Sequence, residues 1–115
     1  MYLTAGAIGA TLASLSRLAP GSELVADYML TADLRDADGA AYVELVMPDS
    51  ERRGEPWLSF FTPEQMTGLL TRHGFTGVRH VRQRDTVGAA LWQRTDRLRP
   101  IEVSRLCHAT VGPRG

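Results

Sequence analysis

The sequence predicts an α/β fold, because segments with helical spacing of apolar residues alternate with short apolar segments that suit strands. One of these, residues 22–30, is almost continuously apolar. That pattern is typical of a strand covered on both faces, and such strands belong to parallel sheets. With 115 residues, 43% hydrophobic and 23% charged, the chain is expected to form one domain or part of one.

The N-terminal half is expected to run helix, strand, helix. Thr4 can cap a helix over residues 5–18, whose apolar side chains recur at i, i+4 and i+7. The strand over residues 22–30 follows it. Residues 33–47 suit a second helix, although Gly39 weakens its first half.

A polar loop and a well-specified helix come next. Residues 48–56 combine charged side chains with Gly and Pro, so we expect an exposed loop there. Thr62 and Gln65 have the spacing of a capping box, which predicts a helix over residues 63–73. Gly74 is suited to the left-handed conformation that often ends a helix.

The C-terminal part is expected to add two strands. Residues 76–84 suit a strand, Asp85 can begin a short helix, and residues 104–111 suit a last strand whose alternation fits an antiparallel position. The tail, residues 112–115, is expected to fray.

Composition excludes several classes of protein. The formal net charge is zero, all thirteen cationic residues are Arg, and no run of five like charges occurs, so nucleic-acid binding is not predicted. A single cysteine, Cys107, excludes an internal disulfide framework. No apolar run reaches the length of a membrane span, and the N-terminal segment lacks the features of a signal peptide. We therefore expect a cytoplasmic protein that does not bind membranes.

Residue patterns alone predict no catalytic residue and no metal site. Cys107 and His108 are adjacent, and neighbours on a strand point to opposite faces, so they are not expected to share a metal. Pairing of Cys107 with His73 or His80 as a thiol–imidazole dyad stays open. A glycine-rich phosphate loop is absent.

An ordered set of short segments resembles the leucine carboxyl methyltransferase-like family of class I S-adenosylmethionine-dependent methyltransferases. The set covers nearly the whole chain. Its members are M-Y-L-T at 1–4, P-G-S-E-L-V-A-D-Y at 20–28, G-E-P-W at 54–57, T-P-E-Q at 62–65, H-G-F at 73–75, L-R-P at 98–100 and R-L-C-H-A-T-V at 105–111.

The resemblance implies an incomplete Rossmann-like sheet. Residues 1–115 would supply the helix after strand four and then strands five, six and seven, which is the C-terminal half of a seven-stranded domain. The family's glycine-rich loop, ribose-binding acid and adenine pocket would lie in the N-terminal half. No cofactor-binding residue is therefore expected here, and Met1 is expected to correspond to an internal methionine.

The function implied by the resemblance is methyl transfer from S-adenosyl-L-methionine to a carboxylate or hydroxyl oxygen of a small-molecule or peptide acceptor. The isolated chain is expected to be inactive. Four residues are candidates for the substrate pocket: Tyr2, Asp27, Trp57 and Phe60. Each has a plainer alternative, with Tyr2 a frayed terminal residue, Asp27 a strand-end residue, and both aromatic residues part of the core.

Two other hypotheses stay open. In the first, the chain is a small non-enzymatic α/β module that pairs with a partner or with itself through an exposed strand at residues 23–30. In the second, it is one chain of a split methyltransferase whose N-terminal half is a separate polypeptide. An exposed apolar edge strand is a feature that natural proteins usually cover.

Overall fold

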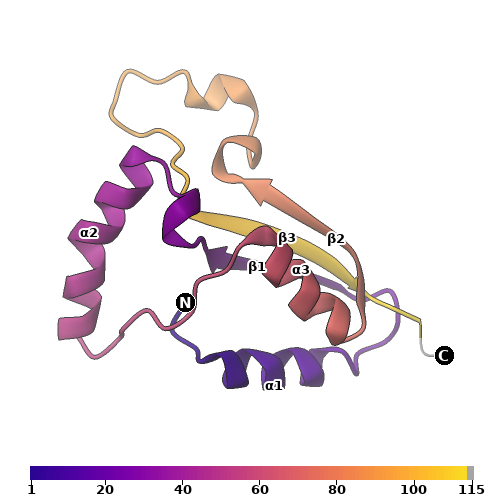
Figure 1. Ribbon diagram of the computed structural model, residues 1–115. Helices are drawn as coiled ribbons and strands as arrows, with labels where there is room; N and C mark the ends of the chain where they lie inside the picture. The colour runs from indigo at the N-terminus through magenta and orange to yellow at the C-terminus, as the bar shows by residue number, and fades with distance from the viewer. Residues whose placement is uncertain (114–115) are drawn as a thin grey trace.

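The computed structural model describes residues 1–113, in which helices and strands alternate and confirm the α/β class (Figure 1). The elements are α1 (Ala5–Leu15), β1 (Glu23–Met29), η1 (Ala32–Leu34), α2 (Ala37–Arg52), α3 (Pro63–Arg72), β2 (Phe75–Arg82), η2 (Gln83–Asp85), η3 (Ala89–Trp92) and β3 (Ser104–Val111), where η denotes a 3₁₀ helix.

The three strands form one sheet in the order β1-β3-β2, and β3 is antiparallel to both neighbours. This is a small antiparallel sheet, and its strand order is not that of a parallel Rossmann sheet. The expectation that β1 is covered on both faces in a parallel pairing is therefore wrong. β1 is an edge strand, and Val25 in its middle is 62% exposed. Its apolar run reflects one covered face plus an exposed valine.

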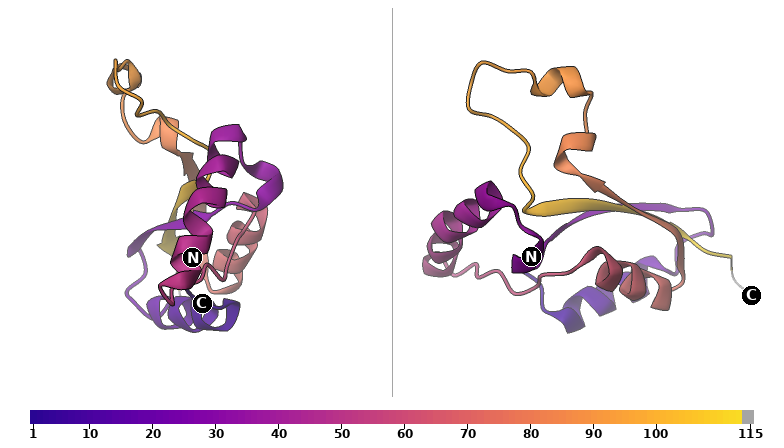
Figure 2. Two further views of the ribbon diagram at one scale, coloured as in Figure 1. Left: turned by 90° about the vertical axis from the view of Figure 1, so that its left-hand side faces the viewer. Right: turned by 45° about the horizontal axis from the view of Figure 1, so that its top comes forward.

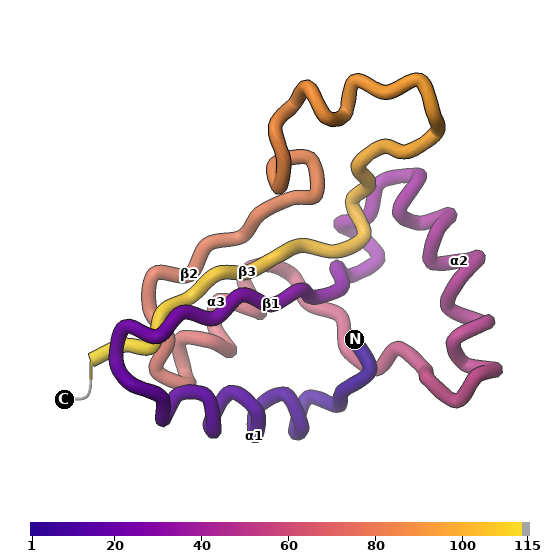
Figure 3. Tube along the Cα trace, turned by 180° about the vertical axis from the view of Figure 1, so that it is seen from behind, coloured from indigo at the N-terminus to yellow at the C-terminus, as the bar shows by residue number. Residues whose placement is uncertain are grey.

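The helices α1 and α3 lie on the same face of the sheet, below it in Figure 1 and in the right-hand view of Figure 2. The view from behind shows α1 running beneath β1 (Figure 3). The opposite face carries the exposed side chains of Glu23, Val25 and Asp27. The helix α2 stands beyond one end of the sheet, and the segment between β2 and β3 loops away from the body (Figure 1).

Two apolar clusters form the core. The larger lies between the sheet and the helices α1 and α3, where Leu30, Leu70 and Phe75 are at most 2% exposed. The smaller joins the end of β1 to α2 through Met29, Val43, Trp57 and Val103.

The helix α1 begins as expected, because the Thr4 hydroxyl accepts a hydrogen bond from the backbone N–H of Ala7 at 3.1 Å. It ends at Leu15, three residues short of the expected boundary. The next backbone N–H groups, those of Arg17 and Leu18, bond three residues back instead of four, so the last turn tightens and the α-helix stops.

The helix α2 is longer and later than the sequence suggested. Its N-cap is Asp36, and it runs to Arg52, so the expected helix over residues 33–47 and loop over residues 48–56 are both wrong in their boundaries. Pro48 lies inside the helix. Proline removes the donor for the carbonyl four residues earlier, and that residue, Glu44, is exposed to solvent, where water can replace the donor.

The helix α3 confirms the predicted capping box. The Thr62 hydroxyl accepts from the backbone N–H of Gln65 at 3.0 Å, and the Gln65 side chain accepts from the N–H of Thr62 at 2.9 Å. The helix ends at Arg72, and Gly74 has the predicted left-handed conformation with φ of 86°. Phe75 then begins β2 directly.

The C-terminal strands are close to expectation. The strand predicted over residues 76–84 is β2, which has an irregularity between Thr76 and Arg79, and the last strand is β3 with the predicted bounds. The short helix expected from Asp85 is replaced by the two 3₁₀ turns η2 and η3.

The start of the tail is held rather than frayed. Gly112 is buried, and its N–H donates to the carbonyl of Gly74 at 2.9 Å. A Cβ at position 112 would lie 2.8 Å from that carbonyl oxygen, so only glycine permits this approach. The expectation of fraying is therefore wrong at Gly112, and residues 114–115 lie outside the described residues.

Candidate functional site

The carboxyl end of β1 is the point where segments distant in the sequence converge. The backbone N–H of Phe61 donates to the carbonyl of Met29 at 2.8 Å, which places residues 57–61 beside the end of the strand. The N–H of Leu58 donates to the carbonyl of Met1 at 2.7 Å, so the N-terminal residues lie there as well.

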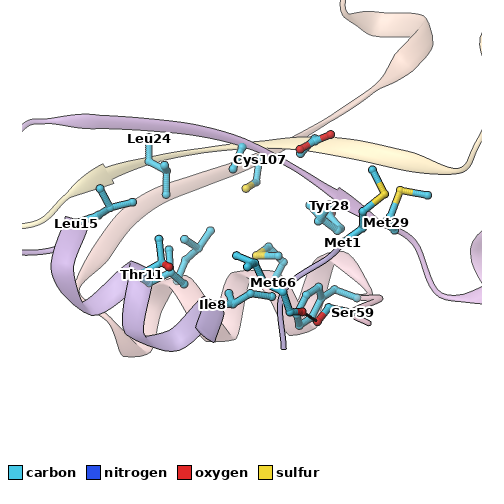
Figure 4. Close-up of a pocket in the computed structure, with 16 residues that line it drawn as sticks. Met1, Ile8, Thr11, Leu15, Leu24, Tyr28, Met29, Ser59, Met66 and Cys107 are labelled. Carbon is cyan, nitrogen blue, oxygen red and sulfur yellow. Dashed lines mark hydrogen bonds between the residues drawn. The ribbon is translucent and has the colours of Figure 1, made fainter. Parts of the chain in front are cut away.

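Two cavities meet at this end of β1. The first, of about 270 Å³, lies between α1 and the sheet (Figure 4). The second, of about 240 Å³, lies between the end of β1, the helix α2 and the start of β3. Both are lined by Met1, Asp27 and Met29. In Figure 4 Met1 and Met29 lie at one end of the first cavity, and the side chains of α1 reach toward β1 from below.

Trp57 is the main aromatic side chain of the second cavity. It is 5% exposed, and its ring stacks on Tyr42 of α2 with centroids 6.5 Å apart and planes inclined by 25°. Its indole N–H is buried and has no hydrogen-bond partner among the described residues. Trp57 is therefore a core residue, as the plainer alternative proposed, and it also presents an unsatisfied donor beside a cavity.

Asp27 is the acidic residue shared by the two cavities, and its side chain is exposed. A carboxylate offers only acceptor atoms, so it is suited to bind N–H or O–H groups of a ligand. Asp27 and Trp57 are therefore the two sequence-predicted candidates that the structure brings to one cavity.

The other two candidates lie elsewhere. Phe60 is half-buried, with the Arg35 guanidinium 5.2 Å from its ring centroid, and it lines a separate cavity beside α3. Tyr2 is 48% exposed and lines neither of the cavities at the end of β1. Sequence reasoning gave no site role to Tyr42, because an aromatic residue on a helix carries no sign of what it will stack on.

A part-buried chain of polar side chains connects β1, β2 and α3. The Tyr28 hydroxyl lies 2.8 Å from Nδ1 of His80, and Nε2 of His80 lies 2.7 Å from the Thr67 hydroxyl. Burial raises the pKa of Tyr28 to about 12. Burial, and then the charge of Arg105, lower the pKa of His80. A neutral imidazole has one donor and one acceptor nitrogen, so both ring nitrogens are satisfied by hydroxyls.

This chain of hydrogen bonds argues against a thiol–imidazole dyad of Cys107 with His80. His80 lies opposite Cys107 on the neighbouring strand β3, but its ring nitrogens are already bonded to the hydroxyls of Tyr28 and Thr67. Burial raises the pKa of the Cys107 thiol, which favours the unreactive protonated form. His108 lies on the opposite face, where it pairs with Glu23 at 3.0 Å. Tyr28 is 3% exposed and is a core residue, as expected.

Among residues 1–113 no group of three or more His, Cys, Asp or Glu side chains is arranged to hold a metal ion. Over the same range, none of the helices has both the length and the apolar character of a membrane span.

Comparison with known proteins gives one informative match. The fold is similar to the crystal structure of a possible exported protein from Bordetella parapertussis, with a TM-score of 0.63 and 16% sequence identity. The similarity covers 94% of this chain and 34% of that one, so this chain spans about a third of the protein that it matches. Neither a protein-family model nor a curated protein matches the sequence.

Proposed function

We propose that this chain is the C-terminal half of a class I S-adenosylmethionine-dependent O-methyltransferase of the leucine carboxyl methyltransferase-like kind, and that its role is to hold the methyl acceptor. The observation that carries the proposal is the pair of cavities at the carboxyl end of β1. In open α/β sheets, ligands bind at the carboxyl ends of the strands.

The arrangement of the strands supports the proposal. Because β1 and β2 are both antiparallel to β3, they run in the same direction, and the helices α2 and α3 connect them. A pair of parallel strands connected through helices is the building unit of α/β sheets. The Bordetella protein offers further support, because there a unit of similar shape is about a third of a longer chain.

The two cavities at the carboxyl end of β1 are small for the cofactor. At about 270 and 240 Å³ they are smaller than the roughly 300–1,000 Å³ typical of sites for drug-sized ligands. We propose, as the resemblance implies, that the cofactor site lies in the N-terminal half of the domain. The cavity lined by Asp27 and Trp57 is instead suited to a small acceptor group.

What this chain contributes is positioning and exclusion of water. The Tyr42–Trp57 stack gives the acceptor cavity an apolar wall, and Asp27 at its mouth can accept a hydrogen bond from the acceptor. Fixing an oxygen nucleophile in a dry, oriented position is the main contribution that an enzyme makes to a direct displacement. Such a reaction needs no metal and no covalent intermediate with the protein, so it does not require a nucleophile–base pair.

We further propose a cytoplasmic location, with a small molecule or peptide as the acceptor and no nucleic-acid or membrane partner. A second candidate function follows from the free edge of β1. A non-enzymatic module that pairs through this edge, or one chain of a split methyltransferase, would have the same feature.

Isothermal calorimetry with S-adenosyl-L-methionine tests the proposal. Residues 1–115 should not bind the cofactor, whereas the same chain joined to or mixed with the polypeptide encoded immediately upstream should bind it at micromolar concentration. Binding by residues 1–115 alone would contradict the assignment of the cofactor site to another segment. Absence of binding in both samples would contradict the methyltransferase function.

A further inference from the structure

The segment between β2 and β3 forms an arm, residues 83–100, that stands away from the rest of the molecule (Figure 2). It includes the 3₁₀ turns η2 and η3. The sheet has the order β1-β3-β2, so the arm connects the central strand with the edge strand on the side away from β1. A sheet extended beyond the free edge of β1 would therefore grow away from the arm.

Positive charge is concentrated in the arm. Its charged residues are four arginines and two aspartates, namely Arg84, Asp85, Arg94, Asp96, Arg97 and Arg99. Its formal charge is therefore +2, and because the whole chain is neutral, the remaining residues carry −2. Such a separation of charge attracts anions to one part of a molecule whose net charge is zero.

The arm also forms a cavity of about 570 Å³, which is more than twice the volume of either cavity at the end of β1. Sites for small organic ligands typically have about 300–1,000 Å³. None of the residues that line this cavity lines the acceptor cavity beside Trp57, so the two are separate. The lining combines one aromatic and one aliphatic side chain with four charged ones, namely Trp92, Leu98, Arg94, Asp96, Arg97 and Arg99.

One positive charge at this cavity is not balanced by a neighbour. The Arg94 guanidinium donates to both carboxylate oxygens of Asp96, at 2.8 and 2.6 Å, and these bonds lower the pKa of Asp96, which therefore stays ionised at neutral pH. Arg99 pairs with Asp38 of α2 at 3.4 Å. The Arg97 side chain has neither an ion pair nor a hydrogen bond among residues 1–113. Its guanidinium is therefore available to bind an anion from solution.

Contacts within the arm hold the walls of the cavity in place. The indole N–H of Trp92 donates to the carbonyl of Arg84 at 3.1 Å, which fixes the edge of the ring and leaves its faces for stacking. The N–H of Leu98 donates to the carboxylate of Asp96 at 3.2 Å, and the Leu98 side chain is 58% exposed. The cavity therefore offers an aromatic and an aliphatic surface together with the unpaired guanidinium of Arg97.

We propose that this cavity binds a small aromatic carboxylate, whose carboxylate pairs with Arg97 and whose ring lies against Trp92 and Leu98. A guanidinium and a carboxylate are both planar, and together they form two parallel hydrogen bonds. The single unbalanced charge matches a monoanion, whereas a phosphate monoester carries a charge of about −1.5 to −2 at neutral pH. The proposal does not depend on methyl transfer, and its test contains no cofactor.

Isothermal calorimetry with naphthoate tests the proposal on the whole chain. We expect saturable binding of naphthoate, and binding about tenfold weaker or less for naphthalenemethanol, which keeps the ring but has no charge. Inorganic phosphate has charge but no ring, and it should also bind more weakly than naphthoate. Equal binding of naphthoate and the neutral alcohol, tighter binding of phosphate, or no saturable binding of naphthoate at millimolar concentration would overturn the proposal.

A matched pair of arginine variants locates the site. Arg97→Gln removes the unpaired charge and should weaken naphthoate binding about tenfold. Arg84→Gln makes the same change of charge on the same arm, but the Arg84 side chain does not line the cavity, so this variant should bind like the original chain. Both residues are exposed, so neither change disturbs the core. Equal weakening by the two variants would indicate general attraction to a basic surface and would contradict a site at Arg97.

Discussion

Replacement of Gly39 by alanine should destabilise the protein, although the same change usually strengthens a helix. Gly39 is the third residue of α2, and its N–H donates to one carboxylate oxygen of Asp36 at 2.7 Å. The other oxygen of Asp36 accepts from the N–H of Glu102 at 3.2 Å. This arrangement brings the segment before β3 against the first turn of the helix, and a Cβ at position 39 would lie 2.2 Å from the carbonyl oxygen of Glu102.

The sign of the effect follows from comparing the two contributions. Alanine in place of glycine within a helix is worth about 1 kcal/mol of stabilisation. Against it, a contact at 2.2 Å is more than 1 Å closer than the 3.4 Å at which ordinary contacts begin, and the atom approached belongs to the backbone. Forcing an extra methyl group into a packed site costs about 1–3 kcal/mol, and loss of the bond from Asp36 to Glu102 adds about 1 kcal/mol. We expect a net destabilisation of about 1–3 kcal/mol.

Urea unfolding followed by circular dichroism measures this free energy, and Gly68 supplies the matched control. Gly68 lies inside α3, and a Cβ there would meet nothing within 4 Å. Gly68→Ala should therefore stabilise the protein by up to about 1 kcal/mol. If Gly39→Ala proved as stable as Gly68→Ala, the close approach of Glu102 to α2 would be wrong.

Three further outcomes are expected. Tyr28→Phe leaves Nδ1 of His80 without its partner and should cost about 1–3 kcal/mol in urea unfolding, whereas a cost near zero would show that the hydrogen bond is not formed. Because the pKa of Tyr28 is raised in the folded protein, the unfolded chain loses this proton first, and stability should fall as the pH rises from 10 to about 12. Because the pKa of His80 is lowered, the unfolded chain gains a proton first, and stability should also fall as the pH drops below about 6.5. The melting temperature measured against pH shows both effects. Tyr28→Phe should remove the part of the alkaline loss that Tyr28 causes, and the part due to the raised pKa of the Cys107 thiol should remain. Thr62→Ala removes the cap on the N–H of Gln65 and should cost about 1 kcal/mol, while Thr62→Ser should cost much less, as thermal unfolding would show.

Local signals in the sequence predicted what depends on neighbours along the chain. The caps at Thr4 and Thr62 and the left-handed Gly74 were all predicted, because each satisfies backbone groups within four residues of itself. The bounds of β3 were also predicted, since its alternation reflects one face against the helices and one toward the open side.

Tertiary contacts explain the features that were missed. The extension of α2 through Pro48 depends on which side of that helix faces solvent. The approach of Gly39 to Glu102 and of Gly112 to Gly74 joins residues that are far apart in the sequence. A glycine inside a helical pattern predicts only a weaker helix, because the sequence does not show which backbone will approach it. At the candidate site, the sequence offers Asp27 and Trp57 as candidates, and the structure places both beside one cavity, but the stack of Trp57 with Tyr42 requires α2 to be placed first.

One unsatisfied donor lies near the end of β1. The indole N–H of Trp57 is buried and has no hydrogen-bond partner among the described residues, and a buried donor of this kind costs free energy as long as nothing binds it. The outward backbone groups of β1 differ, because Glu23, Val25 and Asp27 are exposed and water can bond to them. Trp57 and Asp27 line the same cavity, so a ligand that accepts from the indole and donates to the carboxylate would satisfy both. The unpaired indole therefore favours the second cavity as the place where the acceptor binds.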